Sequence, residues 1–300
     1  MNHFIGEIAA LGTACCWSVG SIFFTISSRK IGHHTVNRLR LVVGLGLLVI
    51  AHYIITGSFW PQSIQGDQLM WFGLSGIIGF AIGDTLLFRS FVLVGPRLAM
   101  LMMALVPVFS TLIAWLFLGQ ILIPLDILAI VITISGIGWV IISRKREKPP
   151  PKQKDVYIPG LLCGVGGALG QAIGLVFSKK GLMTGMMPLS GNILRISIAA
   201  LAVWIISIII GELPRTGRSL KNRRAILAMC GGAFLGPFLG VWLSLIAIDY
   251  AYIGIASTLM ALPPVFLIPL SCWVFREKIN TGGILGTVVA MVGVALIFLL

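Results

Sequence analysis

The chain consists almost entirely of long apolar runs separated by short polar connections. Ten runs contain few charged residues and lie at about 4–26, 35–56, 69–92, 97–118, 124–143, 157–178, 188–210, 225–248, 252–274 and 281–300. A helix that crosses a bilayer needs about 20 predominantly apolar residues, and runs of that length are the sequence signal for one. The pattern therefore predicts an all-α integral membrane protein with ten transmembrane helices.

The apolar pattern contains an internal repeat. Residues 98–109 read LAMLMMALVPVF, and residues 255–266, 157 positions later, read IASTLMALPPVF. A second match relates residues 37–40, NRLR, to residues 192–195, NILR, with an offset of 155 positions. The 157-residue offset also relates three pairs of glycines: Gly79 with Gly236, Gly83 with Gly240, and Gly136 with Gly293. The chain is therefore predicted to be two copies of one unit of about 150 residues.

Each copy contains five of the ten predicted spans. Because five is an odd number, the second copy enters the membrane in the opposite direction from the first, which gives an inverted repeat. The boundary is a highly charged stretch with three consecutive prolines, which is incompatible with a membrane helix. We therefore predict a first five-helix repeat over residues 1–143, a basic, proline-containing linker over 144–156, and a second five-helix repeat over 157–300.

Composition excludes a soluble protein. Hydrophobic residues make up 58% of the chain and charged residues 10%, so little of it is left for a domain outside the membrane. The first run lacks the basic start of a signal peptide and is too long for one, so we interpret it as a span. The five cysteines form no Cys-x-x-Cys or Cys/His cluster, and no Gly-x4-Gly-Lys-Ser/Thr loop is present. Neither a metal site, nor another cofactor, nor direct use of ATP is predicted.

The net charge of +13 has a distribution that fits membrane topology rather than nucleic-acid binding. Of the 22 lysines and arginines, 19 lie in or beside the loops that follow spans 1, 3, 5, 7 and 9. The opposite side carries Lys179 and Lys180, and Arg195 lies within a span. Cytoplasmic loops of membrane proteins carry such an excess of basic residues. We therefore predict a lipid-embedded, multi-pass protein of the cell membrane, inner or plasma, with cytoplasmic basic loops, both termini outside, and no nucleic-acid partner.

The repeated motifs resemble those of EamA-type members of the drug/metabolite transporter superfamily. Repeats of this family typically begin their second helix with an arginine, as Arg40 and Arg195 do, and carry an Ala…Pro-Val-Phe run on the fourth helix, as the repeated run described above does. An acidic residue ends the fourth helix of the family; Glu277 matches it, whereas Gln120 replaces it in the first repeat. The resemblance covers nearly the whole chain and implies a ten-span transporter of a small molecule.

Small multidrug-resistance transporters, four-span relatives in the same superfamily, couple drug export to protons through a glutamate on their first span. The surroundings of that glutamate resemble residues 16–20, CWSVG, and residues 170–174, GQAIG. The glutamate position therefore holds Trp17 in one repeat and Gln171 in the other, and neither side chain can carry a proton. Because the two fused halves supply the interface that four-span relatives make by dimerising, we predict a functional monomer.

Asp84 is the only carboxylate well inside a predicted span. An acidic side chain at that depth costs about 2.5–3.5 kcal/mol on insertion scales and usually faces a partner or a water-filled cavity. Asp84 is therefore a candidate proton or cation site, and the alternative is a structural ion pair with Arg89 or Arg40.

Four further polar residues within spans are candidates for a substrate site. Arg40 and Arg195 either extend toward lipid headgroups or hold an anionic substrate group, and they are also able to pair across the repeat interface. Gln171 and Asn192 either form hydrogen bonds with the substrate or bridge neighbouring helices.

Apolar residues near mid-span complete the candidate set. Trp17 and Trp242 lie away from the interfacial positions that tryptophan usually occupies, so they fit an aromatic-walled cavity or ordinary packing. Met103 is either an adaptable cavity wall or a packing residue. Pro107 and Pro264 interrupt corresponding spans, and paired interruptions in the two halves of a transporter point to its substrate site. A plain packing kink is the alternative.

The predicted function is alternating-access transport that exports a small metabolite or drug from the cytoplasm through a mid-membrane cavity between the two repeats. Metabolite uptake and a channel or scaffold without transport are the alternatives. An intramembrane aspartyl protease needs two facing carboxylates, but the only partner candidate for Asp84 is Asp249, at the far end of span 8. The chain is therefore not predicted to be an enzyme.

Overall fold

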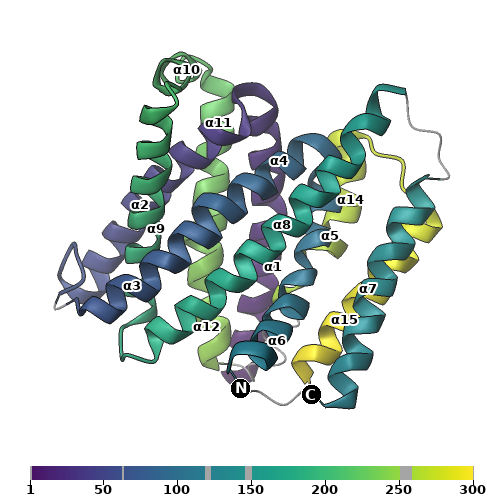
Figure 1. Ribbon diagram of the computed structural model, residues 1–300, viewed down its shortest axis with the longest axis horizontal. Helices are drawn as coiled ribbons and strands as arrows, with labels where there is room; N and C mark the ends of the chain where they lie inside the picture. The colour runs from purple at the N-terminus through teal and green to yellow at the C-terminus, as the bar shows by residue number, and fades with distance from the viewer. Residues whose placement is uncertain (1, 63, 119–122, 146–150, 251–258, 300) are drawn as a thin grey trace.

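The computed structural model describes residues 2–62, 64–118, 123–145, 151–250 and 259–299. These residues form helices with short connections, and no strand occurs among them. Figure 1 shows the helices gathered in one bundle. They are α1 (Asn2–Ile31), α2 (His33–Thr56), α3 (Gly66–Ser75), η1 (Gly76–Gly83), α4 (Asp84–Val94), α5 (Pro96–Met103), α6 (Leu105–Leu118), α7 (Pro124–Lys145), α8 (Pro151–Leu182), α9 (Pro188–Ile209), α10 (Leu213–Ser219), α11 (Arg223–Ala233), η2 (Phe234–Gly240), α12 (Val241–Tyr250), α14 (Pro263–Phe275) and α15 (Thr281–Leu299).

Eight helical stretches are long and apolar enough to cross a membrane, and they correspond to the first eight predicted runs. The ninth and tenth runs correspond to two shorter apolar helices, Pro263–Phe275 and Thr281–Ile297. Residues 251–258, at the start of the ninth run, lie outside the described part of the chain. The chain is therefore an all-helical, multi-pass membrane protein.

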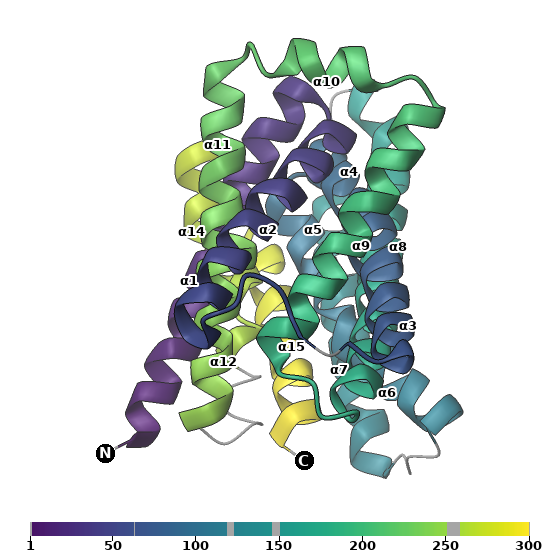
Figure 2. The ribbon, with the colours of Figure 1, turned by 90° about the vertical axis from the view of Figure 1, so that its left-hand side faces the viewer.

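The bundle has two distinct ends. Both termini lie at one end, the terminal end, and α10 lies across the other, the α10 end (Figures 1 and 2). α1 runs from the terminal end to the α10 end, whereas α8, which begins the second half, runs the opposite way (Figure 1). Arg215 and Arg218 of α10 and the last basic residues of α1, Arg29 and Lys30, gather at the α10 end.

Helices from the two halves pack against each other in matching pairs. α1 packs against α11, η2 and α12, and its counterpart α8 packs against α3, η1 and α4. Likewise, α2 packs on α9, and α7 packs on α15. The largest buried apolar cluster includes Phe24 of α1, Phe88 of α4 and Leu98 of α5. The halves are therefore interlocked rather than joined side by side.

Two segments are π-helices, in which an N–H group bonds to the carbonyl five residues earlier instead of four. η1 joins α3 to α4, and η2 joins α11 to α12. At the end of η1 the N–H of Asp84 donates to the carbonyl of Gly79. Pro237 of η2 has no N–H, so the regular α-helical bond is missing there. Because the 157-residue offset relates 76–83 to 233–240, both halves widen at the same place.

The paired proline interruptions are also present. α5 ends at Met103 and α6 begins at Leu105, and the N–H of Ala104 turns back to the carbonyl of Leu101 at 3.1 Å. Pro107 explains this break, because its missing N–H leaves the Met103 carbonyl without the usual helical donor. In the second half, α14 begins with two prolines, and Leu262 precedes them as its N-cap.

Candidate functional site

A buried ion pair lies where η1 meets α4. Asp84, the first residue of α4, is only 5% exposed and is paired with the Arg40 guanidinium of α2. Gln171 of α8 donates a hydrogen bond from Nε2 to the Asp84 Oδ1 atom at 2.5 Å. Arg89, the other proposed partner, is exposed. The structural pairing of Asp84 with Arg40 is thus present, and it is built into a contact between the two halves.

Arg40 points into the bundle rather than toward the headgroups. Its side chain is buried, and Nε donates to Asn37 Oδ1 at 3.0 Å. Its guanidinium lies 4.8 Å from the ring centroid of Phe88 and 6.0 Å from that of Phe80. Such cation–π contacts strengthen when water is excluded, so the aromatic rings help to hold the charge at this depth.

Arg195 of α9 brings a second positive charge to the same place. Its guanidinium lies over the Phe80 ring, 4.5 Å from the centroid, and the side chain is half-buried. The buried Nε has no hydrogen-bond partner, and no carboxylate of the described residues lies within 4 Å of this guanidinium. Arg40, Asp84 and Arg195 therefore form a cluster with one net positive charge.

Side-chain amides hold the widened η1 segment in place. Asn37 Nδ2 donates to the Phe80 carbonyl at 3.0 Å and to Thr85 Oγ1 at 2.8 Å. Gln171 Nε2 also approaches the Gly79 carbonyl at 3.3 Å. Backbone carbonyls in a membrane-spanning segment need such donors. Gln171 thus links α8 to η1 and to Asp84. Asn192 lies buried one turn before Arg195 on α9.

Glycines allow the backbones around this cluster to touch. A side chain on Gly76 of η1 would collide with the backbone carbonyl of Arg195. On α8, Gly170 lies against Gly83, and Gly174 lies against Gly79. Small residues permit this close approach between membrane helices. These glycines therefore allow Gln171 and Arg195 of the second half to lie close to Asp84 of the first.

We expect Gly76→Ala to displace α9 from η1 and lower the free energy of unfolding by about 1–3 kcal/mol, the usual range for overpacking. The matched control is Gly46→Ala on α2, where an added methyl group meets nothing within 4 Å. Thermal unfolding in detergent compares the two variants. An unchanged midpoint for Gly76→Ala would contradict this contact.

The remaining predicted residues lie outside the charged cluster. Trp17 of α1 packs on Gly240 of η2. This matches the second repeat, where Gln171 of α8 packs on Gly79 and Gly83 of η1. Trp242, 39% exposed, lines a cavity of about 610 Å³ whose other lining residues are aliphatic residues, Met187, Pro188 and Phe238. Met103 packs at the edge of the main core, and Pro107 and Pro264 mark the helix interruptions.

Sequence reasoning missed two ion pairs between the halves at the α10 end. Arg38, fully buried on α2, pairs with Glu212 at 3.0 Å. Arg97 of α5 pairs with Glu277, beyond α14, at 3.4 Å. A charged residue inside an apolar run needs a counterion, so the sequence predicts that Arg38 has an acidic partner. It does not predict which acidic residue that partner is. Within the described part of the chain, no group of three metal-ligating side chains occurs.

Comparisons with known proteins agree with this architecture. The profile of the EamA-like transporter family matches residues 4–142 and again residues 158–299. A solved structure described as "Crystal structure of protein" has 15% identity and a TM-score of 0.63, and the match covers 98% of this chain and 96% of that chain. At that identity the likeness shows the fold alone. A search of the curated proteins gives no match. The chain belongs to the EamA-like transporter family and contains the family unit twice, as the repeat predicted.

Proposed function

We propose that the chain is an alternating-access secondary transporter whose binding site is the cluster of Arg40, Asp84, Gln171 and Arg195. The cluster is assembled from both halves: the first two residues belong to the first repeat, and the last two to the second. A ligand held by such a cluster contacts both halves at once, so its binding energy can bias their relative position. Secondary transporters with repeated halves place their substrates at this kind of interface.

The transport mechanism follows from an inverted repeat of five plus five spans. The opposite directions of α1 and α8, the matched π-helices and the matched proline interruptions all support that symmetry. We place the basic α10 end in the cytoplasm and both termini outside, because lysine and arginine gather in cytoplasmic loops. In this orientation, export begins with substrate entry from the α10 end. Because the two fused halves supply the whole binding interface, a monomer is sufficient for transport.

The transported molecule carries an anionic group. The net positive charge of the cluster, and above all Arg195 with its unpaired Nε, carries this proposal. An arginine in low dielectric binds a carboxylate or phosphate through charged, often bidentate hydrogen bonds. The anion also competes with Asp84 for Arg40. The two halves are joined here by the Arg40–Asp84 ion pair and by the hydrogen bond from Gln171 to Asp84. Substrate binding thereby weakens this connection.

The test compares wild-type chain, Arg195→Gln and the matched control Arg89→Gln, all expressed at equal levels, by measuring metabolites in cells and medium. We expect wild type and Arg89→Gln to shift an anionic metabolite outward. Arg195→Gln should reduce this export about tenfold or more, since a hydrogen bond to a charged group contributes about 1.5–3 kcal/mol. Full export of the anion by Arg195→Gln would refute the assigned site.

The alternatives give different outcomes. An uptake permease would deplete the same anion from the medium, and a channel would conduct it without saturation. A scaffold would leave all metabolites unchanged. For an aspartyl protease the geometry is unfavourable, because the mechanism needs two carboxylates that share a proton, whereas Asp84 is paired with Arg40.

A further inference from the structure

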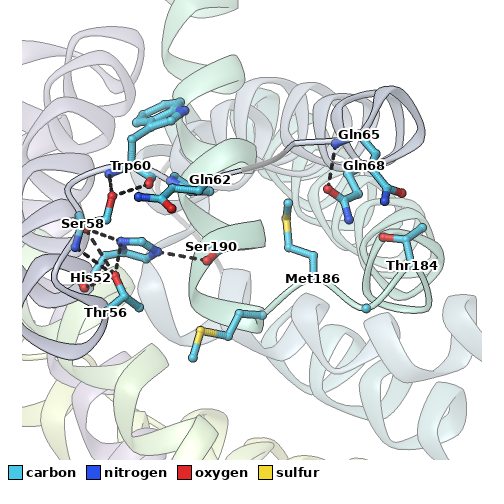
Figure 3. A pocket seen from close by; sticks show the side chains of 13 residues that line it. His52, Thr56, Ser58, Trp60, Gln62, Gln65, Gln68, Thr184, Met186 and Ser190 are labelled. Carbon is cyan, nitrogen blue, oxygen red and sulfur yellow. Dashed lines mark hydrogen bonds between the residues drawn. The ribbon is translucent and has the colours of Figure 1, made fainter.

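A polar cavity lies apart from the charged cluster, between the end of α2, the connection to α3, and the connection between α8 and α9. Its volume is about 440 Å³, within the range of small-molecule sites. Figure 3 shows His52, Trp60 and Gln62 on one side, Gln65, Gln68 and Thr184 on the other, and Met186 between them. Both halves of the chain therefore contribute walls.

One wall is organised by His52, which is 3% exposed. Its Nδ1 lies 2.6 Å from the carbonyl oxygen of Ser58, which only accepts, so Nδ1 carries the hydrogen. In the neutral ring, Nε2 then accepts a hydrogen bond from the Ser190 hydroxyl at 3.0 Å. This chain of hydrogen bonds links α2, the following loop and α9, so the wall is built before any ligand arrives.

The opposite wall is fixed by a reciprocal helix cap. The N–H of Gln65 donates to the Gln68 Oε1 atom at 3.0 Å, and the Gln65 side chain accepts from the N–H of Gln68. Ser58 holds the connection on the other side by donating to the Trp60 carbonyl at 2.8 Å. Hydrogen bonds thus define the positions of the His52, Ser58, Gln65 and Gln68 side chains in the cavity walls (Figure 3).

Among the described residues that line the cavity there is no acidic, lysine or arginine side chain. A buried unpaired charge is costly, so such a lining disfavours a charged ligand. An amide presents a donor and an acceptor side by side, and so does a hydroxyl group. Trp60, a residue that is 45% exposed, adds an indole ring. We propose that this cavity binds an uncharged, polyhydroxylated molecule of sugar size, with an apolar ring face on Trp60 and hydroxyl groups on the amides of Gln62 and Gln68.

This site is distinct from the proposed transport site in charge and in residues. The charged cluster selects an anion through Arg195, whereas this cavity selects a neutral ligand. A matched set of three probes separates the two preferences: glucose, glucosamine and glucuronate share one ring and differ in charge. Equilibrium binding of each labelled probe to the purified full chain in detergent is the measurement.

We expect saturable binding of glucose and much weaker binding of the two charged probes. Trp60→Leu should weaken glucose binding about tenfold, because the indole provides the largest apolar contact area of the site. Trp273→Leu is the matched control, since Trp273 lies on α14 and is 81% exposed. Gln62→Glu should weaken glucose binding and raise that of glucosamine, because it adds a negative charge to the cavity.

Two results would overturn the inference. One is glucose binding that is absent from wild type, or no stronger than that of both charged probes. The other is glucose binding that survives both Trp60→Leu and Gln62→Glu but is lost in Asp84→Asn, which would place the ligand at the charged cluster. Absence of glucose binding leaves the transport proposal standing, because it does not concern export of the anion. Glucose bound at the charged cluster would also contradict an anionic substrate there.

Discussion

An Asp84→Leu variant is expected to lose about 3–5 kcal/mol of unfolding free energy, because it leaves Arg40 buried without its counterion. Arg40 is 6% exposed and lies against Phe88 and Phe80, so water replaces Asp84 poorly in this conformation. The loss also removes the acceptor of Gln171, so the contact between the halves weakens at the same point. Unfolding in denaturant, with helix content as the signal, measures the change.

The double variant Arg40→Met/Asp84→Leu separates stability from transport. Replacing a whole buried ion pair by apolar side chains is often neutral or stabilising, so the double variant should recover most of the lost stability. It should still fail to export the anion, because the cluster has lost the arginine for which the substrate competes. A stable double variant with normal export would show that this pair is only structural.

The second large effect is expected at Gly136, where α7 crosses α15. A methyl group there would meet the backbone of Ala290 and the carbonyl of Gly286 at 2.8 Å, and backbone atoms cannot rotate away. Gly136→Ala should therefore lower the unfolding free energy by about 3 kcal/mol, the upper end of the usual overpacking range.

Gly138→Ala provides a control of opposite sign. Gly138 is two residues further along α7, and nothing lies within 4 Å of an added methyl group. Alanine is a better helix former than glycine by about 0.8–1 kcal/mol, so this variant should be slightly more stable than wild type. If both variants shift the unfolding midpoint in the same direction, the close α7–α15 crossing is wrong.

Much of the fold follows from local information in the sequence. Apolar runs of spanning length predicted helices at the right places, and the repeat of residues 98–109 predicted two family units. The candidate cluster was partly predictable as well. Asp84 is predictable because a carboxylate within a span needs a partner. Gln171 is predictable because it occupies the position of the coupling glutamate in the small multidrug-resistance transporters. The structure brings these residues together with Arg40 and Arg195.

The rest depends on contacts that residue types do not encode. The π-helices are one example, since glycine and proline permit the widening, but the amides of Asn37 and Gln171 that satisfy its carbonyls come from other helices. Phe80 is another, because its position between the two arginines depends on how α2 and α9 cross η1. The polar cavity is built from the connections between helices in both halves. The pattern of apolar runs predicts helices only, so it does not predict how these connections meet.

The residues of the ion pairs at the α10 end have no charged counterparts in the sequence of the other repeat. The repeat offsets relate Arg38 to Ile193, Arg97 to Gly254 and Glu277 to Gln120, so the matching positions are uncharged. Among the described residues, the salt bridges that join the two copies thus lie at the α10 end. A cross-repeat contact of another kind, between the Lys180 ammonium and the Trp71 ring at 4.7 Å from its centroid, lies toward the terminal end. In an exact inverted repeat, the conformations open to either end would be equally populated.

If the chain alternates between conformations open at either end, as we propose, these pairs set the ratio of the two populations. If separating each pair costs about 1.5–3 kcal/mol, the conformation open at the α10 end holds between about one molecule in a hundred and one in ten thousand. A substrate entering from that end binds more weakly by the same factor, because only the open fraction is competent. In the proposed orientation, four side chains remote from the proposed binding cluster would thereby govern the apparent affinity from the cytoplasmic side.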